Sequence, residues 1–123
     1  MNWCFQAIRN YAKFSGRACR KEYWAFTTLD SVLMYGSIVV AGQAGVAHSK
    51  WFYIPLGIYA VLMIIPRLSV TFRRLHDANA SGAFILWYAL PIAGFFIVSI
   101  QLLRKGDRGE NNYGLPCGDI EKA

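Results

Sequence analysis

The chain has 123 residues, of which 55% are hydrophobic, 15% aromatic and 16% charged, and its formal net charge is +6. This length suits one domain, and the high apolar and aromatic content excludes an intrinsically disordered chain. The charges are also unevenly placed, because none occurs from Ala78 to Leu103 and only Asp30 and Lys50 occur from Tyr23 to Pro66. Charge-free stretches of this length indicate a membrane protein rather than a soluble domain.

Residues 1–22 form a basic segment that precedes the first apolar stretch. Within it, the apolar side chains of Cys4, Phe5, Ile8 and Tyr11 recur at helical spacing, with polar residues on the opposite face. This pattern predicts an amphipathic helix that lies at the membrane interface, and Ser15-Gly16 is expected to end it.

Three transmembrane helices are predicted, at 23–41, 51–72 and 83–103. About 20 helical residues rise about 30 Å, which matches the hydrocarbon core of a bilayer. Pro66 predicts a kink in the second span because proline removes a backbone donor, and Pro91 interrupts the third span near its middle. We therefore expect a single all-α membrane domain with a polar tail at 104–123.

The distribution of basic residues predicts the orientation. In a three-span protein, the segment before the first span and the loop between the second and third spans lie on the same side. Together with Arg67, near the end of the second span on the same side, they hold eight of the 13 Lys and Arg residues, which predicts a cytoplasmic N-terminus by the positive-inside rule. The tail then lies on the opposite side. In the alternative, the third segment is broken and re-entrant at Pro91, and the tail returns to the cytoplasmic side.

Three motifs resemble those of one bacterial inner-membrane family. They are Phe14–Trp24 (FSGRACRKEYW), Phe72–Asp77 (FRRLHD) followed by Ser81-Gly82, and Gly106–Gly114 (GDRGENNYG) with Pro116. Because the three motifs occur in this order and at this spacing, the chain resembles the domain of unknown function 805 family (DUF 805) over nearly its whole length. The resemblance implies a small inner-membrane protein of several helices, and it implies no established activity, substrate or catalytic residue.

The first two motifs place charged side chains on one predicted side of the membrane. We expect an ion-pair cluster there, with Glu22 opposite Arg73 or Arg74, because arginine binds carboxylates and phosphates in a bidentate manner. The excess positive charge favours binding of anionic lipid headgroups or of a partner protein. The candidate binding residues are Arg17, Arg20, Arg73, Arg74, His76 and Asp77. A structural role, in which the motif only locks the loop, is the alternative.

Asp30 lies inside the first predicted span, where an ionisable side chain is costly. It should therefore face protein or water, with Arg67 or nearby hydroxyl groups as partners. An intramembrane carboxylate also suits a transporter or channel component, which is a second functional hypothesis. A third hypothesis is an enzyme that acts on lipid headgroups through His76 and Asp77.

No cofactor, metal site or catalytic residue is predicted. The three cysteines have no short paired spacing, and His48 and His76 are predicted on opposite sides of the membrane. The aromatic residues fall at predicted membrane interfaces, which argues against nucleic-acid binding. The sequence therefore favours a non-enzymatic, multi-pass protein of the bacterial inner membrane that binds lipid or a partner. That partner is another membrane protein or a second copy of the chain.

Overall fold

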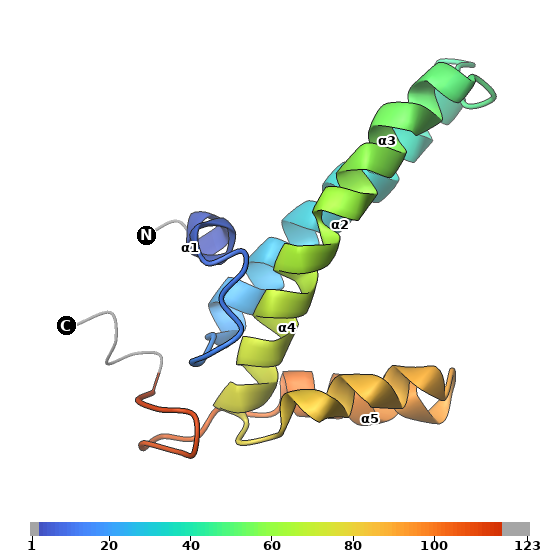
Figure 1. Ribbon diagram of the computed structural model, residues 1–123. Helices are drawn as coiled ribbons and strands as arrows, with labels where there is room; N and C mark the ends of the chain where they lie inside the picture. The colour runs from blue at the N-terminus through green and yellow to red at the C-terminus, as the bar shows by residue number, and fades with distance from the viewer. Residues whose placement is uncertain (1–2, 117–123) are drawn as a thin grey trace.

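The computed structural model describes residues 3–116, and all the regular elements of that part of the chain are helical, which confirms the all-α prediction. The elements in chain order are α1 (Trp3–Arg9), α2 (Arg20–Gln43), α3 (Lys50–Leu62), α4 (Ile64–Asp77), the 3₁₀ helix η1 (Gly82–Ala89) and α5 (Ala93–Leu103), as Figure 1 shows.

A long helical hairpin dominates the molecule (Figure 1). Helix α2 forms one arm, and α3 and α4 together form the other, antiparallel arm; the turn between the arms contains Gly45, at a φ of 72°. The second arm is interrupted at Met63, three residues before Pro66. A proline ring clashes with the carbonyl four residues earlier, which here belongs to Leu62, the last residue of α3. The predicted kink is therefore confirmed.

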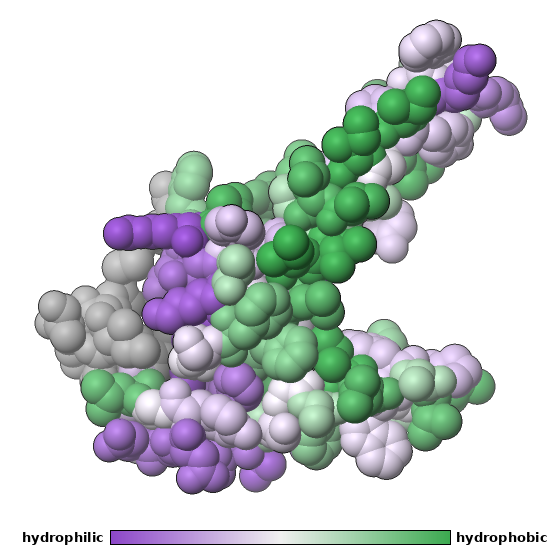
Figure 2. Space-filling view, viewed as in Figure 1, coloured by the Kyte–Doolittle hydropathy of each residue, from purple (hydrophilic) through white to green (hydrophobic). Residues whose placement is uncertain are grey.

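The two arms have the length and composition of membrane-spanning helices. They comprise the 24 residues Arg20–Gln43 and the 28 residues Lys50–Asp77, and only 17% of the most apolar 18-residue window in each arm is buried. A core helix of a soluble protein would instead bury most of such a window. Exposed apolar side chains gather along the arms on the face that Figure 2 shows. The predicted spans 23–41 and 51–72 lie within these two arms.

The prediction of a third continuous span at 83–103 is wrong. The segment breaks around Pro91 into η1, with eight residues, and α5, with 11 residues, and α5 doubles back along η1 (Figure 1). Each piece rises only about 16 Å, roughly half of the hydrocarbon core. The two pieces meet closely at Gly94, where an added Cβ atom would overlap the carbonyl oxygen of Trp87.

Because the third segment doubles back, the expectation of a tail at the opposite end of the molecule is also wrong. The backbone N–H of Asp107 donates to the Asp77 carbonyl at 3.0 Å, so the tail lies beside the end of α4. The break at Pro91 that the alternative requires is present, and the membrane side on which the tail lies stays a prediction. Ten of the Lys and Arg residues in the described part of the chain belong to the three segments that meet here, the N-terminal segment, the end of α4 and the tail: Arg9, Lys13, Arg17, Arg20, Lys21, Arg73, Arg74, Arg104, Lys105 and Arg108. We call this end of the molecule the arginine-rich end.

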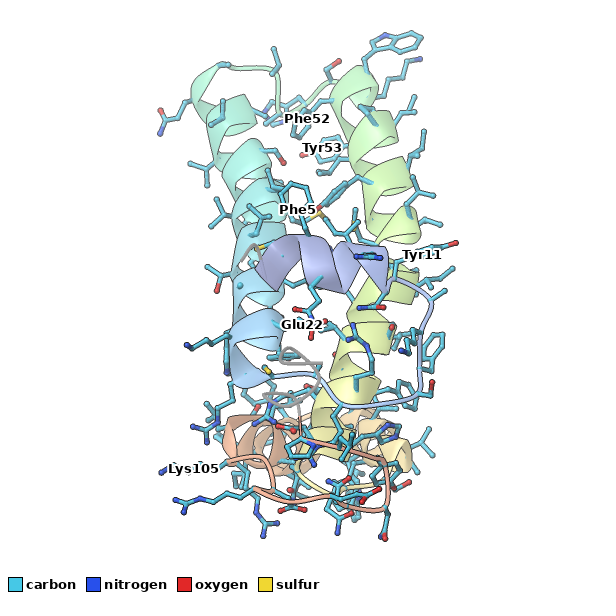
Figure 3. The ribbon with its side chains drawn as sticks, turned by 90° about the vertical axis from the view of Figure 1, so that its left-hand side faces the viewer. Phe5, Tyr11, Glu22, Phe52, Tyr53 and Lys105 are labelled. Carbon is cyan, nitrogen blue, oxygen red and sulfur yellow. The ribbon has the colours of Figure 1, made fainter. Side chains whose placement is uncertain are left out.

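Helix α1 lies across α2 and α4 (Figure 3). Ala7 is buried against them, whereas Phe5, Ile8 and Tyr11 are exposed on the outer side. Helix α1 is shorter than the amphipathic helix expected from the sequence. An interfacial location for its exposed apolar face stays a prediction.

Two membrane crossings put the two chain termini on the same side, whereas three crossings would put them on opposite sides. We predict that a fluorescent reporter that folds only in the cytoplasm is active when fused to either terminus. A reporter enzyme that is active only in the periplasm should be active when it replaces the turn at 44–49. Periplasmic activity of a fusion after residue 123 would contradict the doubled-back third segment.

Candidate functional site

Three segments that are distant in the sequence meet at the arginine-rich end: residues 17–22, the end of α4, and residues 104–114. Charged side chains of the first two segments form the arginine cluster, which comprises Arg17, Arg20, Glu22, Arg73, Arg74 and Asp77. Most of these side chains are buried, since Arg74 is 0%, Glu22 1% and Arg73 3% exposed. Buried charges require partners, because an unpaired charge in a low-dielectric interior is costly.

The two carboxylates of the arginine cluster supply those partners. Neighbouring residues on a helix point about 100° apart, so Arg73 and Arg74 of α4 reach different acids. Arg73 Nη1 donates to Glu22 Oε1 at 2.7 Å, and Arg74 Nη1 donates to Asp77 Oδ2 at 2.5 Å. Arg17 Nε donates to the other oxygen of Asp77 at 2.9 Å. Asp77 is thus held between two guanidinium groups.

Arg17, Arg20 and Arg74 also donate to backbone carbonyls at the end of α5 and in the tail. Arg17 reaches the carbonyl oxygens of Gly109 at 2.8 Å and of Asp107 at 2.6 Å. The last carbonyls of α5 have no helical partner. Arg74 donates to those of Leu102 and Arg104, and Arg20 donates to those of Leu103 and Arg104. The two guanidinium groups therefore cap α5, where positive charge also suits the helix dipole.

The sequence analysis did not predict that the tail supplies these carbonyl acceptors. The glycine at position 106 could have indicated that the tail packs closely against another segment. Gly106 packs directly against the Asp77 carboxylate, and an added Cβ atom would overlap that group. A Cβ atom at Gly109 would meet open space. Gly106 is therefore required for close approach of the tail to the arginine cluster.

His76 and Asp77 face different partners. Both Asp77 oxygens accept from arginines, whereas the His76 ring stacks on Tyr113 with 4.0 Å between ring centroids. His76 Nδ1 lies 3.3 Å from the Gly16 carbonyl oxygen, and the His76 carbonyl accepts from Asn111 Nδ2 at 2.9 Å. The two residues thus hold the loop and the tail together. They do not form the adjacent acid–base pair that a headgroup-cleaving enzyme would need.

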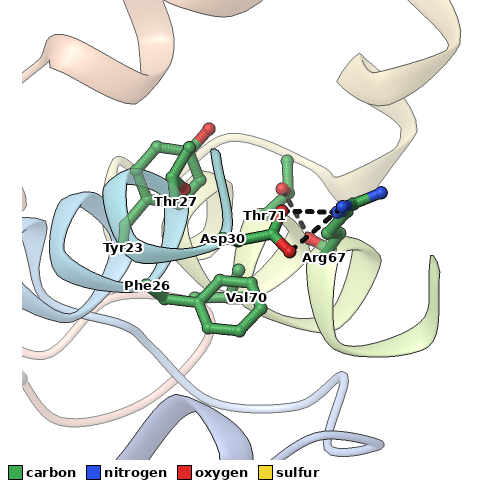
Figure 4. Close-up of a pocket in the computed structure, with 7 residues that line it drawn as sticks. All are labelled: Tyr23, Phe26, Thr27, Asp30, Arg67, Val70 and Thr71. Atoms are coloured by element: carbon green, nitrogen blue, oxygen red, sulfur yellow. Dashed lines mark hydrogen bonds and ion pairs between the residues drawn. The ribbon is translucent and has the colours of Figure 1, made fainter. Parts of the chain in front are cut away.

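Asp30 lies against Arg67 in the interior of the hairpin (Figure 4). Arg67 Nε and Nη2 donate to its two oxygens at 2.6 and 3.0 Å, and Tyr59 donates its hydroxyl to Asp30 Oδ1 at 2.8 Å. This pairing balances the charge of the carboxylate within the apolar hairpin. A cavity of about 180 Å³ lies beside the pair, and its other lining residues are Tyr23, Phe26, Thr27, Val70 and Thr71.

A second cavity, of about 70 Å³, lies between the N-terminal segment and α4; we call it the Arg73 cavity. It is lined by Gln6, Asn10, Lys13, Ser15, Gly16, Arg17 and Arg73. Within the described residues, Arg73 Nε, Arg73 Nη2 and Gln6 Oε1 are buried without a hydrogen-bond partner. No group of three or more His, Cys, Asp or Glu side chains in residues 3–116 is arranged to hold a metal ion.

A helical hairpin with an apolar outer surface and a basic end is the architecture of a small multi-pass membrane protein. The chain belongs to the family described as "Protein of unknown function (DUF805)", whose model matches residues 11–115. It is 34% identical over 114 residues to "Inner membrane protein YhaI" of Escherichia coli, covering 93% of each chain. It is 32% identical to "Inner membrane protein YhaH" of the same organism, covering 93% of this chain and 94% of that protein. No solved structure matches. Together these findings identify an inner-membrane protein.

The Glu22–Arg73 pair is testable by charge exchange. Glu22→Arg leaves two buried cations facing each other, and we expect it to lower the free energy of unfolding by about 3–5 kcal/mol. The double variant Glu22→Arg, Arg73→Glu restores an opposite-charge pair and should recover more than half of that loss. The control, Glu110→Arg, changes an exposed residue of the same end and should shift stability by less than about 0.5 kcal/mol. SDS-induced unfolding in mixed micelles measures all three, and an absence of rescue would refute the contact.

The close approach at Gly106 gives a second prediction. Gly106→Ala forces the tail away from Asp77, and we expect it to destabilise the protein by about 1–3 kcal/mol, as overpacking does. Protease cleavage between residues 104 and 116 should become faster. Gly109→Ala, which meets open space, is the matched control and should leave both measurements unchanged. Equal cleavage of the two variants would show that the tail is not packed as described.

Proposed function

We propose that the chain is a non-enzymatic membrane module that binds anionic lipid headgroups, or a partner protein, at its arginine-rich end. We assign this end to the cytoplasm. The observation that carries the proposal is the placement of basic residues. Ten of the 12 Lys and Arg residues in the described part lie at this end; Arg67 lies within the hairpin and Lys50 at the far end. This asymmetry is much larger than the sequence alone suggested, and the positive-inside rule supports the orientation.

The charge of this end is not neutralised by its own acids. Within residues 3–116, Glu22, Asp77, Asp107 and Glu110 oppose the ten basic residues, which leaves an excess of +6. Six of the basic side chains are exposed: Arg9, Lys13, Lys21, Arg104, Lys105 and Arg108. Each basic residue near an anionic leaflet contributes about 1 kcal/mol of attraction. The buried arginines hold the tail in place, so that its three cations lie beside those of the N-terminal segment.

The engagement of both Asp77 oxygens by arginines supports a binding role over acid–base chemistry. The pairing of Asp30 with Arg67 and Tyr59 likewise supports a structural role for that carboxylate. Binding by the arginine cluster is then indirect for Arg17 and Arg74, which donate to groups of the protein itself. His76 and Asp77 act in the same indirect way. Arg20 donates through Nε and Nη2, and its half-buried Nη1 remains for a ligand.

The proposal predicts a loss of lipid selectivity when the exposed tail cations are removed. In mixed vesicles of phosphatidylglycerol and phosphatidylcholine, the wild-type chain should retain phosphatidylglycerol preferentially, as native mass spectrometry can measure. The triple variant Arg104→Gln, Lys105→Gln, Arg108→Gln should reduce that preference at least about tenfold. Lys50→Gln, at the opposite end, is the control and should leave it unchanged. Unchanged selectivity in the triple variant would overturn lipid binding at this end.

A further inference from the structure

The doubled-back segment, residues 82–103, comprises η1 and α5 and has a largely apolar surface. No charged residue occurs in it. The buried residues of α5 are Gly94, Val98 and Leu102, which recur every four positions and form one narrow stripe. On the other sides, large apolar and aromatic side chains are exposed: Leu86, Trp87, Tyr88, Leu90, Ile92, Phe95, Phe96, Ile100 and Leu103. Such an exposed apolar surface marks a contact with a membrane or with another protein.

The turn of this segment differs in polarity from the turn of the long hairpin. The hairpin turn at 44–49 contains His48 and is followed by Lys50, as suits a turn in water. The turn at 90–92 consists of Leu, Pro and Ile, and Ile92 is 76% exposed. The apolar surface of the segment therefore continues around its turn. This continuity favours lipid as the surroundings, because the exposed apolar side chains of the arms belong to the same membrane protein.

Both ends of the doubled-back segment are held at the arginine-rich end. At its start, the Gly82 backbone packs against Phe72 of α4, whose ring an added Cβ atom would overlap. At its end, Arg74 Nε donates to the Leu102 carbonyl at 3.1 Å. Only the turn at 90–92 can therefore extend away from the arginine-rich end.

The segment is too short to enter the far leaflet. Each of its two helices rises about 16 Å, roughly half of the hydrocarbon core, and any tilt reduces the depth that it reaches. The first N–H groups of α5 have no partner within the helix, and lipid-exposed groups of this kind do not occur in the middle of the hydrocarbon. Length and backbone chemistry both keep the turn in the leaflet next to the arginine-rich end.

The two halves of the molecule differ in width as a consequence. The near leaflet contains the first half of α2, together with α4, η1 and α5, whereas the far leaflet contains only the end of α2 and α3. Figure 1 shows this difference, because η1 and α5 leave the arms at the arginine-rich end and nothing lies beside the far half of the arms. Helix α1 widens the same half, since it lies across α2 and α4 (Figure 3).

We propose that the doubled-back segment inserts into the leaflet next to the arginine-rich end alone, and that the resulting wedge shape makes the chain prefer membrane that is convex on that side. A protein that is wider in one leaflet displaces more lipid there, and a convex leaflet has the looser packing that accommodates it. The binding partner is thus the acyl-chain region of a curved bilayer. This inference goes beyond the proposed function, because it does not depend on headgroup charge.

Depth-dependent quenching of fluorescence tests the insertion. All four native Trp residues are replaced by Phe in the full chain, and Ile92→Trp then supplies one reporter at the turn. In vesicles of brominated phosphatidylcholine, we expect the strongest quenching by bromine midway along the acyl chain. Val46→Trp in the same background reports the aqueous hairpin turn and should be quenched weakly. Weak quenching of the Ile92→Trp reporter, or strongest quenching by bromine at the chain ends, would overturn the insertion.

The curvature preference is measured on the wild-type chain in giant vesicles of phosphatidylcholine, from which thin membrane tubes are drawn. A fluorophore on the N-terminus and an impermeant quencher outside distinguish the two orientations. Molecules whose arginine-rich end faces outward should be at least about twofold denser in the tube than in the vesicle, and molecules of the opposite orientation should be depleted. Equal density of the outward-facing molecules in tube and vesicle would overturn the wedge.

Two sets of truncations at exposed positions should shift this enrichment in opposite directions. One set narrows the near half: Leu86→Ala, Ile92→Ala and Phe96→Ala. The matched set narrows the far half: Val40→Ala, Val61→Ala and Leu62→Ala. The first set should lower the enrichment toward one, and the second should maintain or increase it. A larger loss of enrichment from the second set than from the first would contradict the wedge.

The triple variant Arg104→Gln, Lys105→Gln, Arg108→Gln separates this inference from the proposed function. It should lose selectivity for anionic lipid but keep its enrichment in phosphatidylcholine tubes, because its exposed apolar surface is unchanged. Loss of that enrichment in the triple variant would overturn the wedge, since charge rather than shape would then cause the preference. Lipid selectivity of the wild type without any enrichment in tubes would also overturn it, and would leave the proposed function standing.

Discussion

The fold at the arginine-rich end depends on one carboxylate, that of Asp77, held between Arg17 and Arg74. Both guanidinium groups are almost fully buried, so neither tolerates the loss of its acid. Arg17 brings the segment before α2 to the end of α4, and Arg74 reaches the last turn of α5. Their remaining donors bind backbone carbonyls of the tail. A single acid thus ties three distant segments together, and Gly106 leaves the space that this requires.

This arrangement divides the basic residues between two tasks. The arginines of the family motifs are mostly buried and act on carboxylates and carbonyls of the protein itself. The exposed lysines and arginines around them carry the charge that an anionic surface or ligand would meet. Arg73 belongs to the buried group: one of its nitrogens pairs with Glu22, and its Nε and Nη2 are buried without a hydrogen-bond partner among the described residues. A positive surface held in place by a buried ion-pair cluster suits a binding module better than a reaction centre.

Local features were predictable from the sequence, and contacts between distant segments only in part. The two arms follow from uninterrupted apolar stretches, and the break at Met63 follows from Pro66, because both depend on neighbouring residues. The sequence also named Arg67 as a candidate partner for Asp30 and Arg73 as one for Glu22, and the structure places both pairs in contact. The prediction of a third span was wrong for a physical reason. Its length and apolar content suit a crossing, but Pro91 breaks the helix and the glycine at 94 lets the two pieces pack together.

The sequence by itself determined the membrane class, the family and the helical nature of the chain, because hydropathy, length and motif order are properties of the linear chain. Only the tertiary structure decided where the tail lies and which arginine donors remain unused. Those outcomes depend on carbonyl groups that every residue carries and that no sequence pattern distinguishes. The return of the tail moved three basic residues to the N-terminal side, and thereby gathered nearly all the positive charge of the described chain at one end.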